Sequence, residues 1–558
     1  MDRFWVRQYP PGTPAEIDPN EYRSLKQLIE LSFSQFPQRT AYIQMEQRLS
    51  YAQLDRHSAQ FAAWLQQRGM RKGDRIAIML PNILQYPIVM FGALRAGLTV
   101  VNTNPLYTAS ELEHQLRDSG ATALVVLENF AAVAEQALAV VPVPHVIVTS
   151  VGDLLSFPKG AIVNFVIRHV QRKVPAWHLP DALPLTRILG ATPATPNPVD
   201  VGHEDIAYLQ YTGGTTGVSK GAMLTHGNMI ANVLQARAWF KQVQIDNTTY
   251  VCALPLYHIF SLTANCLLFS SLGGAGHLIA NPRDFKGFVS ELRKHPPMFF
   301  MGVNTLFNAL MNTPGFSELD FKRLVATVGG GMAVQRAVAE RWQQVTGCVV
   351  TQGWGLTEAS PAGCVNPLVG VGFTGAVGLP LPSTEVTIRD DDGKDLGINA
   401  TGEICLRGPQ VMRGYWQRPE ETAQVMLPDG WLRTGDIGRI DDRGYVFIED
   451  RKKDMIIVSG FKVFPNEVED VVAHHPGVAE VAAVAQADER SGEAVALFIV
   501  KRDPALTADD IMQHCQKYLT GYKLPRHIYF GDALPKTNVG KILRRALRDE
   551  LAGSTRGS

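Results

Sequence analysis

The sequence predicts an α/β protein with a large N-terminal domain of layered α/β sheets, a β-rich subdomain and a small α+β C-terminal domain. Three observations lead to this fold class. At 558 residues the chain is too long for one ordinary domain. Short apolar runs alternate with helical patterns through its first three quarters, and the pattern changes near Glu385 and again after Asp450. We therefore expect two domains, residues 1–450 and 451–558.

The first three quarters of the chain show the alternation expected of parallel sheets covered by helices. The runs "RIAIML" (75–80), "ATALVVL" (121–127) and "MFFMGV" (298–303) are short and apolar, as buried strands are. Helical segments lie between such runs, and one of them, "SAQFAAWLQQRG", ends at Gly69, a residue type common at helix ends. Strands separated by helices favour parallel α/β layers.

From Glu385 onward, strands follow one another through short turns. "EVTIRD", "GEICLRG" and "YVFIED" are joined by segments such as "DDGKD" and "DDRG", which indicates a compact β-rich subdomain. After the charged stretch 450–454, the pattern predicts a helix, two strands, a helix, a strand and a last helix from Lys541. The size of this unit is within the usual range for a domain.

The composition argues against several classes of protein. The formal net charge is +0, so we expect no nucleic-acid partner. The six cysteines form no CxxC pair, which favours buried thiols in a reducing compartment. Charges and prolines near the N-terminus replace the apolar core of a signal peptide, and the longest uncharged run, near 259–280, predicts a buried helix, a turn and a strand. We expect a cytoplasmic protein.

Residues 154–180 contain no acid and four Lys or Arg residues. On a helix, Ile162, Val166 and Val170 fall on one arc, whereas Asn164 and Arg168 fall opposite. A basic amphipathic helix can lie on the anionic inner face of the cytoplasmic membrane. The alternative is a surface helix whose apolar face packs on the same protein.

The stretch "YTGGTTGVSKGAMLTH" (211–226) has the composition of a loop that wraps phosphate oxygens. Its glycines let backbone amides approach an anion, its hydroxyls donate hydrogen bonds, and Lys220 supplies a point charge. A Walker loop needs GxxxxGK followed by Ser or Thr, but here Lys220 follows Ser219 and precedes Gly221. This disfavours a P-loop ATPase and predicts a phosphate loop of another design, with a flexible surface turn as the alternative.

Four further motifs follow this loop. "QGWGLTEAS" (352–360) sets an aromatic residue among glycines, before a hydroxyl and a carboxylate that suit a magnesium-nucleotide site. Asp436 in "WLRTGDIG" is a candidate acceptor for a ribose diol. "EDRKKDMIIVSGFKVFPNEVED" (449–470) joins a cation cluster to a glycine turn, and "PKTNVGKILRR" (535–545) sets Lys541 beside a glycine. Each motif alone has an ordinary structural explanation, such as a solvated acid or a surface lysine.

Taken together and in this order, the motifs resemble the acyl- and aryl-adenylate-forming superfamily of acyl-CoA synthetases, firefly luciferase and peptide-synthetase adenylation domains. Segments such as "NPLYT", "ALPLYHIF" and "GVNTLFNAL" are similar to bacterial long-chain fatty-acid–CoA ligases. The resemblance implies that a fatty-acid carboxylate attacks the α-phosphate of ATP, giving acyl-AMP and pyrophosphate. The thiolate of coenzyme A then displaces AMP. Mg²⁺ is the implied metal.

The resemblance also implies roles for residues at matching positions. The residues around the β- and γ-phosphates are Tyr211, Thr212, Gly213, Gly214, Thr215, Thr216, Gly217 and Lys220. The residues beside adenine and the acyl chain are Gly330, Gly331, Met332, Gly353, Trp354 and Gly355, with Trp354 where the family usually has tyrosine. The residues for the ribose are Asp436 and Arg451, and those for Mg²⁺ are Glu358 and Thr216.

The implied catalytic residues are Lys541, His258, Glu358 and Thr357, of which Thr357 would reach the α-phosphate. The Lys541 ammonium would stabilise the anionic transition state of adenylation. His258 would shape the acyl-carboxylate end of the site, with a buried structural histidine as the alternative.

In this family the C-terminal domain is mobile and rotates between the half-reactions, here around a hinge at Lys453. Its other face would bring Gly460, Phe461 and Lys462 to coenzyme A. The alternative for these three residues is an ordinary strand-to-turn corner.

Several alternatives stay open from the sequence. A medium-chain or aryl-acid CoA ligase, or an acyl-AMP ligase that feeds a carrier protein, would share the same motifs. A catalytically silent lipid-binding protein is disfavoured by Lys541, Glu358, Asp436 and the intact loop. A monomer and a homodimer are both compatible with the sequence, and so is peripheral binding to an anionic membrane through 154–180.

Overall fold

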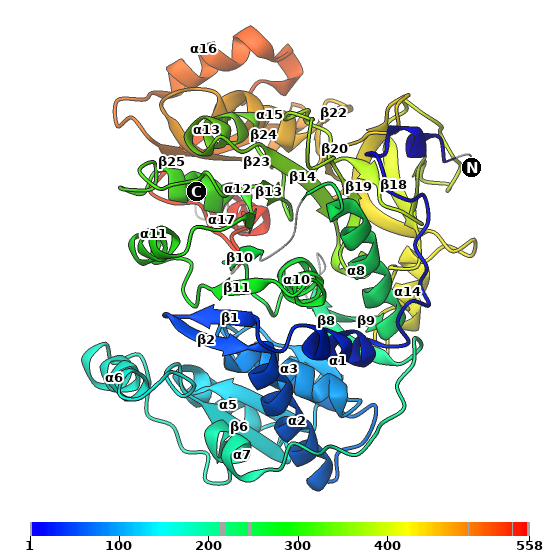
Figure 1. Ribbon diagram of the computed structural model, residues 1–558. Coiled ribbons are helices and arrows are strands. Elements are labelled where there is room, and N and C mark those ends of the chain that lie inside the picture. Colours follow the sequence, from blue (N-terminus) through cyan, green and yellow to red (C-terminus); the bar gives the residue numbers. More distant parts are fainter. Residues whose placement is uncertain (1–2, 213–218, 244–247, 489, 538, 555–558) are drawn as a thin grey trace.

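Two large sheets with helices packed against them form the first three quarters of the chain (Figure 1). The structure is a computed structural model, and it describes residues 3–212, 219–243, 248–488, 490–537 and 539–554. One sheet has seven strands, and all its neighbouring pairs are parallel except β8–β9. In spatial order they are β7 (Leu183–Pro184), β6 (His145–Thr149), β5 (Ala123–Leu127), β3 (Arg75–Met79), β4 (Thr99–Asn102), β8 (Ile206–Thr212) and β9 (Lys220–Thr225).

The second large sheet has nine strands, with a parallel centre and antiparallel strands at both edges. In spatial order they are β16 (Leu379–Pro380), β15 (Ala362–Val365), β14 (Val350–Gly355), β13 (Ala326–Gly329), β12 (Phe299–Gly302), β10 (Thr249–Cys252), β11 (Ala275–Leu278), β1 (Thr40–Gln44) and β2 (Gln47–Ser50). The expected parallel α/β layers are therefore confirmed.

Local signals in the sequence begin and end the helices. Ser50 and Gln53 form a capping box at the start of α2, and Thr108 and Glu111 form one at the start of α4, which ends at the left-handed Gly120. The helices of these layers are α1 (Leu25–Gln35), α2 (Tyr51–Gln67), α3 (Gln85–Arg95), α4 (Ala109–Ser119), α5 (Ala131–Leu138), α6 (Lys159–Phe165), α7 (Leu185–Ala191), α8 (His226–Phe240), α9 (Ile259–Ser261), α10 (Leu268–Ser271), α11 (Phe285–Lys294), α12 (Asn304–Met311) and α13 (Arg336–Thr346).

The β-rich subdomain is an antiparallel four-stranded sheet, as the short turns predict. Its strands are β17 (Glu385–Arg389), β18 (Gly402–Arg407), β19 (Leu432–Ile440) and β20 (Val446–Arg451), with α14 (Pro419–Val425) between β18 and β19. Because β20 ends at Arg451 and the next strand begins at Ile456, the chain leaves this subdomain at the charged stretch noted in the sequence.

The C-terminal unit is a five-stranded sheet with three helices and hydrophobic clusters of its own. Its elements are β21 (Ile456–Val458), β22 (Phe461–Val463), α15 (Pro465–Ala473), β23 (Val478–Asp488), β24 (Gly492–Lys501), α16 (Ala508–Tyr518), β25 (His527–Gly531) and α17 (Arg544–Ser554). The small α+β unit is confirmed, but its last helix begins at Arg544 and not at Lys541. Lys541 instead lies in a turn before this helix, and its own backbone N–H donates to Oγ1 of Thr537.

The helix predicted near residues 154–180 exposes part of its apolar arc and keeps the rest, Val163, Val166 and Ile167, partly buried. It comprises α6 and a π-helical turn, Val166–Val170, and Figure 1 shows α6 at the edge of the molecule. Asn164 donates to Asp153, and Arg168, although itself exposed, is paired with Glu128, so these two polar side chains tie the helix to the protein. The exposed apolar side chains include Phe157, Ile162, Phe165 and Val170.

No helix among the described residues is long and apolar enough to cross a membrane. The uncharged run near 259–280 folds, as expected, into helix α9, a π-helical segment Leu262–Leu267, helix α10 and strand β11. Its helical residues Leu262, Leu267 and Phe269 are fully buried. This run therefore supplies core to the nine-stranded sheet.

Candidate active site

Lys541 of the C-terminal unit lies against the glycine turn that follows β13. A Cβ atom on Gly331 would be 3.4 Å from Cε of Lys541 and 3.8 Å from its Nζ, and Gly331 has a φ of +75°. The turn that carries Lys541 is held to α12, where Oγ1 of Thr305 donates a 2.8 Å hydrogen bond to the carbonyl of Gly540. Two motifs some two hundred residues apart thus form one site.

Trp354 and Arg451 hold the carboxylate of Asp436 from two sides. Nε1 of Trp354 donates a 2.8 Å hydrogen bond to Oδ2, and Nε of Arg451 lies 2.7 Å from Oδ1. Asp436 and Arg451 are register partners on β19 and β20, so the pairing of these strands fixes their spacing. The structure therefore brings together the two predicted ribose residues and the predicted adenine-site tryptophan.

The backbone of Gly330, just after β13, closely approaches the backbone of Gly353 on β14. A Cβ atom on Gly330 would lie 3.0 Å from the carbonyl oxygen of Gly353 and 3.4 Å from the ring of Phe260. These distances leave little room for a side chain, which explains a glycine at this position. Met332 is partly buried against the main core, and Gly355 ends β14 just before Thr357 and Glu358.

Glu358 is held by a residue that the sequence did not single out. The hydroxyl of Tyr415 donates a 2.7 Å hydrogen bond to Oε1 of Glu358, and the backbone N–H of Met412 donates to its carbonyl. Nζ of Lys220 lies 5.5 Å from the centre of the Tyr415 ring, a cation–π distance. Among the described residues nothing donates to Oε2, so this hard carboxylate oxygen fits a Mg²⁺ ion.

The surroundings of Lys541 and His258 set their protonation. Burial lowers the pKa of Lys541 to about 8, with a further lowering by Arg451 that Asp436 and Glu358 oppose. Burial, followed by the nearby Lys541 ammonium, lowers the pKa of His258 to about 3. His258 is therefore neutral at neutral pH, and its Nδ1 accepts from the N–H of Phe260 at the start of α9.

The phosphate loop is bounded by a pair of antiparallel strands. Thr212 ends β8 and pairs with Lys220, which begins β9. The side chain of Tyr211 is buried and donates to Asp118. The predicted loop residues Gly213, Gly214, Thr215, Thr216 and Gly217 lie outside the described residues.

The residues predicted for the coenzyme A step lie on a hairpin turn, away from Lys541. Ser459 and Gly460 both have positive φ between β21 and β22, as a tight two-residue hairpin requires. Phe461 is 57% exposed and stacks on Tyr522, and Lys462 is also exposed. The predicted hinge residue Lys453 lies in the turn between β20 and β21.

Arg544 is a second residue that sequence reasoning missed. It donates three hydrogen bonds of 2.8, 2.9 and 3.1 Å to Glu469 and lies 3.4 Å from Asp450, at the end of the subdomain. The motif "GKILRR" contains Arg544, but its partners lie 75 and 94 residues away, so no local pattern could identify them.

The chain matches two family models in the order of its two parts. Residues 29–416 match the model described as AMP-binding enzyme, and residues 467–541 match the AMP-binding enzyme C-terminal domain. Curated long-chain-fatty-acid–CoA ligases are similar over nearly the whole chain. That of Salmonella typhimurium is 52% identical over 99% of both chains, and that of Yersinia pestis is 53% identical over 99% of this chain and 98% of the relative. That of Bacillus subtilis is 36% identical over 98% of both chains.

Solved structures share the fold. An anthranilate CoA ligase, AuaEII, in complex with anthranoyl-AMP has a TM-score of 0.87 at 24% identity and covers 97% of this chain and 100% of its own. ATP-bound MatB from Rhodopseudomonas palustris has a TM-score of 0.78 at 26% identity and covers 94% of this chain and 99% of its own. The expected resemblance and the expected fold class are both confirmed.

Proposed function

Because this chain belongs to the family of AMP-binding enzymes, we propose that it activates long-chain fatty acids with ATP and transfers them to coenzyme A through an acyl-adenylate. Pyrophosphate leaves in the first half-reaction and AMP in the second. The observation that carries the proposal is the position of Lys541 against Gly331, where its charge interacts with Asp436 and Glu358.

The side chains support a division of tasks in adenylation. Oxygen atoms of Asp436, held by Trp354 and Arg451, would accept hydrogen bonds from the ribose diol. The Lys541 ammonium would lie between the attacking carboxylate and the α-phosphate, where it offsets the repulsion of two anions. Neutral His258 would leave the acyl carboxylate without a competing cation.

Glu358 and Thr216 would hold Mg²⁺, which when bound neutralises phosphate charge and polarises the P–O bonds. Thr357, next to Glu358, would donate to the α-phosphate. The phosphate loop from Tyr211 to Lys220 would hold the leaving pyrophosphate.

For the second half-reaction we assign residues 451–558 as a mobile lid on the domain formed by 1–450, with its hinge at Lys453. The docked Lys541 and the exposed Gly460–Lys462 turn suit the adenylating arrangement. Rotation at the hinge would withdraw Lys541 and bring Gly460, Phe461 and Lys462 to coenzyme A.

The test is a substrate series. AMP release that depends on coenzyme A should rise from hexanoate to the long-chain acids hexadecanoate and octadecanoate. Maximal activity with hexanoate or with benzoate would favour a medium-chain or aryl-acid ligase. Acyl-AMP accumulation without use of coenzyme A would favour an enzyme that feeds a carrier protein. The proposal applies equally to a monomer and a homodimer.

We also propose that the segment 154–180 binds the inner face of the cytoplasmic membrane, where long-chain acids partition. Phe157, in the turn before α6, is 89% exposed, and Phe165 and Val170 are 59% and 66% exposed on a helix that Asn164 and Arg168 tie to the protein. Lys173 is exposed near these side chains and suits an anionic surface. The segment thus presents several large apolar side chains to solvent.

Sedimentation with phosphatidylglycerol vesicles tests this part of the proposal. Combined Phe157→Ser and Phe165→Ser should weaken binding more than ~10-fold, because each buried phenyl group contributes about 1.5–3 kcal/mol. Val140→Ser, at a side chain that is 56% exposed and lies outside 154–180, is the matched control. Equal sedimentation of all three proteins would remove the membrane role.

A further inference from the structure

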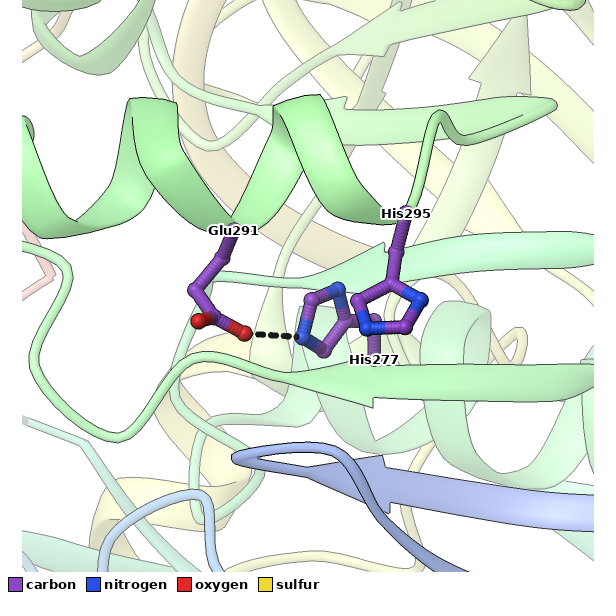
Figure 2. A group of neighbouring side chains, drawn as sticks. All are labelled: His277, Glu291 and His295. Atoms are coloured by element: carbon purple, nitrogen blue, oxygen red, sulfur yellow. Dashed lines mark hydrogen bonds and ion pairs between the residues drawn. The ribbon is translucent and has the colours of Figure 1, made fainter.

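His277, Glu291 and His295 form a cluster of metal-binding side chains that the proposed reaction does not use. One ligand atom from each residue lies within 4.8 Å of the other two. Figure 2 shows the carboxylate of Glu291 and the ring of His295 on either side of the His277 imidazole. We infer that these three residues bind a divalent transition-metal ion of the zinc class, at a site separate from the nucleotide residues.

The three residues are held by rigid backbone. His277 lies on the interior strand β11, in register with Val251 of β10 and Ile43 of β1. Glu291 and His295 are one helical turn apart at the end of α11, and the N–H of His295 donates to the carbonyl of Glu291. Ligands fixed on a strand and a helix keep their spacing better than ligands on loops.

The chemistry of the donors suits zinc. Nε2 of His277 lies 3.0 Å from Oε2 of Glu291. Two ligands of a tetrahedral zinc ion with bonds of about 2.0 Å are about 3.3 Å apart, so this pair is already near coordination distance. Two imidazoles and one carboxylate are a common protein ligand set, and a water molecule completes the tetrahedron.

Two buried imidazole nitrogens in the cluster lack partners. Within the described part of the chain, neither Nδ1 of His277 nor Nε2 of His295 has a hydrogen bond, although both atoms are buried. His277 is only 3% exposed, and the two rings lie edge to face with their centres 4.7 Å apart. Buried polar atoms are normally paired, so the unpaired Nε2 of His295 points to a ligand. His277 would give the ion its Nε2 in place of the hydrogen bond to Glu291, and its unpaired Nδ1 would then carry the ring proton.

The second oxygen of Glu291 is turned toward a cation that is already paired. Oε1 of Glu291 is 3.7 Å from Nζ of Lys294, which donates a 2.9 Å hydrogen bond to Glu46. Glu46 therefore compensates Lys294, and Oε2 of Glu291 remains directed at His277. A bound metal ion would join α11 to the sheet at β11.

Zinc titration of the tag-free, chelator-treated full chain tests the inference by calorimetry. We expect one zinc ion per chain. Glu291→Gln and His295→Gln should each weaken zinc affinity more than ~10-fold, since even changes to residues that only contact a zinc ligand lower zinc affinity ~10–100-fold. His178→Gln, at an exposed histidine elsewhere, should bind as the unchanged chain does. Glu358→Gln should also bind zinc with unchanged affinity, and this result would distinguish the zinc site from the proposed magnesium site.

Thermal unfolding gives a second readout that does not depend on activity. Zinc should raise the Tm of the unchanged chain and of His178→Gln, because a ligand of the folded state stabilises it, but not that of Glu291→Gln. The metal-free proteins should unfold at similar temperatures, because Gln replaces partly exposed Glu291 with the same shape. Equal zinc affinity in the unchanged chain and both cluster variants, or no zinc binding, would overturn the inference.

Discussion

Nε1 of Trp354 donates a 2.8 Å hydrogen bond to Oδ2 of Asp436, and both side chains are buried. Trp354 stands where the family resemblance predicts a tyrosine. The structure shows that the indole N–H supplies a donor of its own. Asp436 is thereby oriented with Oδ1 toward Arg451.

This relationship predicts the effect of removing the indole donor. Trp354→Phe keeps an aromatic face but leaves the buried carboxylate with one donor fewer. Hydrogen bonds to charged groups contribute about 1.5–3 kcal/mol, so the KM for ATP should rise ~10-fold or more. Trp354→Tyr should recover part of this loss if its hydroxyl reaches Asp436. A KM for ATP that is unchanged in Trp354→Phe would show that Asp436 does not need the indole.

Replacing the Lys541 ammonium should separate the two half-reactions. Lys541→Ala removes the cation that lies against Gly331, so acyl-AMP formation should fall at least ~100-fold, the loss of about 2.7 kcal/mol typical of a transition-state donor. Thioester formation from supplied acyl-AMP should stay within a few-fold. Pyrophosphate release and acyl-CoA formation measure the two steps. An equal fall in both would argue against the assignment of Lys541 to adenylation.

The lowered pKa of Lys541 predicts a pH dependence. Burial brings this pKa to about 8, and the charged ammonium is the active form. Lys541 is fully protonated well below that pH and loses its proton above it. The kcat/KM for ATP in adenylation should therefore decline as pH rises through about 8. Lys541→Arg keeps its charge over this range, and its residual activity should lack the decline. If Lys541→Arg showed the same decline at alkaline pH, the decline would belong to the titration of another group.

The magnesium role of Glu358 has a direct test. Glu358→Gln keeps the hydrogen-bonding shape next to Tyr415 but removes the negative charge. The Mg²⁺ concentration for half-maximal adenylation should rise more than ~10-fold, because loss of a ligand exceeds the effect of its outer-shell partners. Tyr415→Phe should cause a smaller rise. An unchanged magnesium requirement in Glu358→Gln would contradict the metal role.

How far the sequence predicted the fold and the site depends on whether the signal is local. Neighbouring residues encode strand β3, the turns of the subdomain and the "LTE" segment with Glu358. Local sequence patterns therefore predicted the positions of these features. Tyr415 reaches Glu358 across 57 residues, and the amphipathic pattern around Arg168 cannot say which side meets the protein. Such contacts arise from tertiary packing, which periodicity does not contain.

Arg544 provides the last prediction, on stability. Its guanidinium contacts the buried carboxylates of Glu469 and Asp450, whereas the neighbouring Arg545 is exposed and lies 3.7 Å from the exposed Asp549. Arg544→Met leaves two buried acids without their cation and should lower the stability of the C-terminal unit by about 3–5 kcal/mol. Arg545→Met is the matched control and should change it by less than about 1 kcal/mol, as an exposed ion pair does.

Amide hydrogen exchange of β23 and β24 is the suitable measurement, because no tryptophan follows Trp431 and fluorescence would not report on this unit. Exchange in these strands should accelerate in Arg544→Met and stay unchanged in Arg545→Met. If the C-terminal unit docks through Asp450, adenylation should also fall in Arg544→Met while thioester formation from acyl-AMP is retained. Equal exchange in both variants would show that the acids around Arg544 do not depend on its charge.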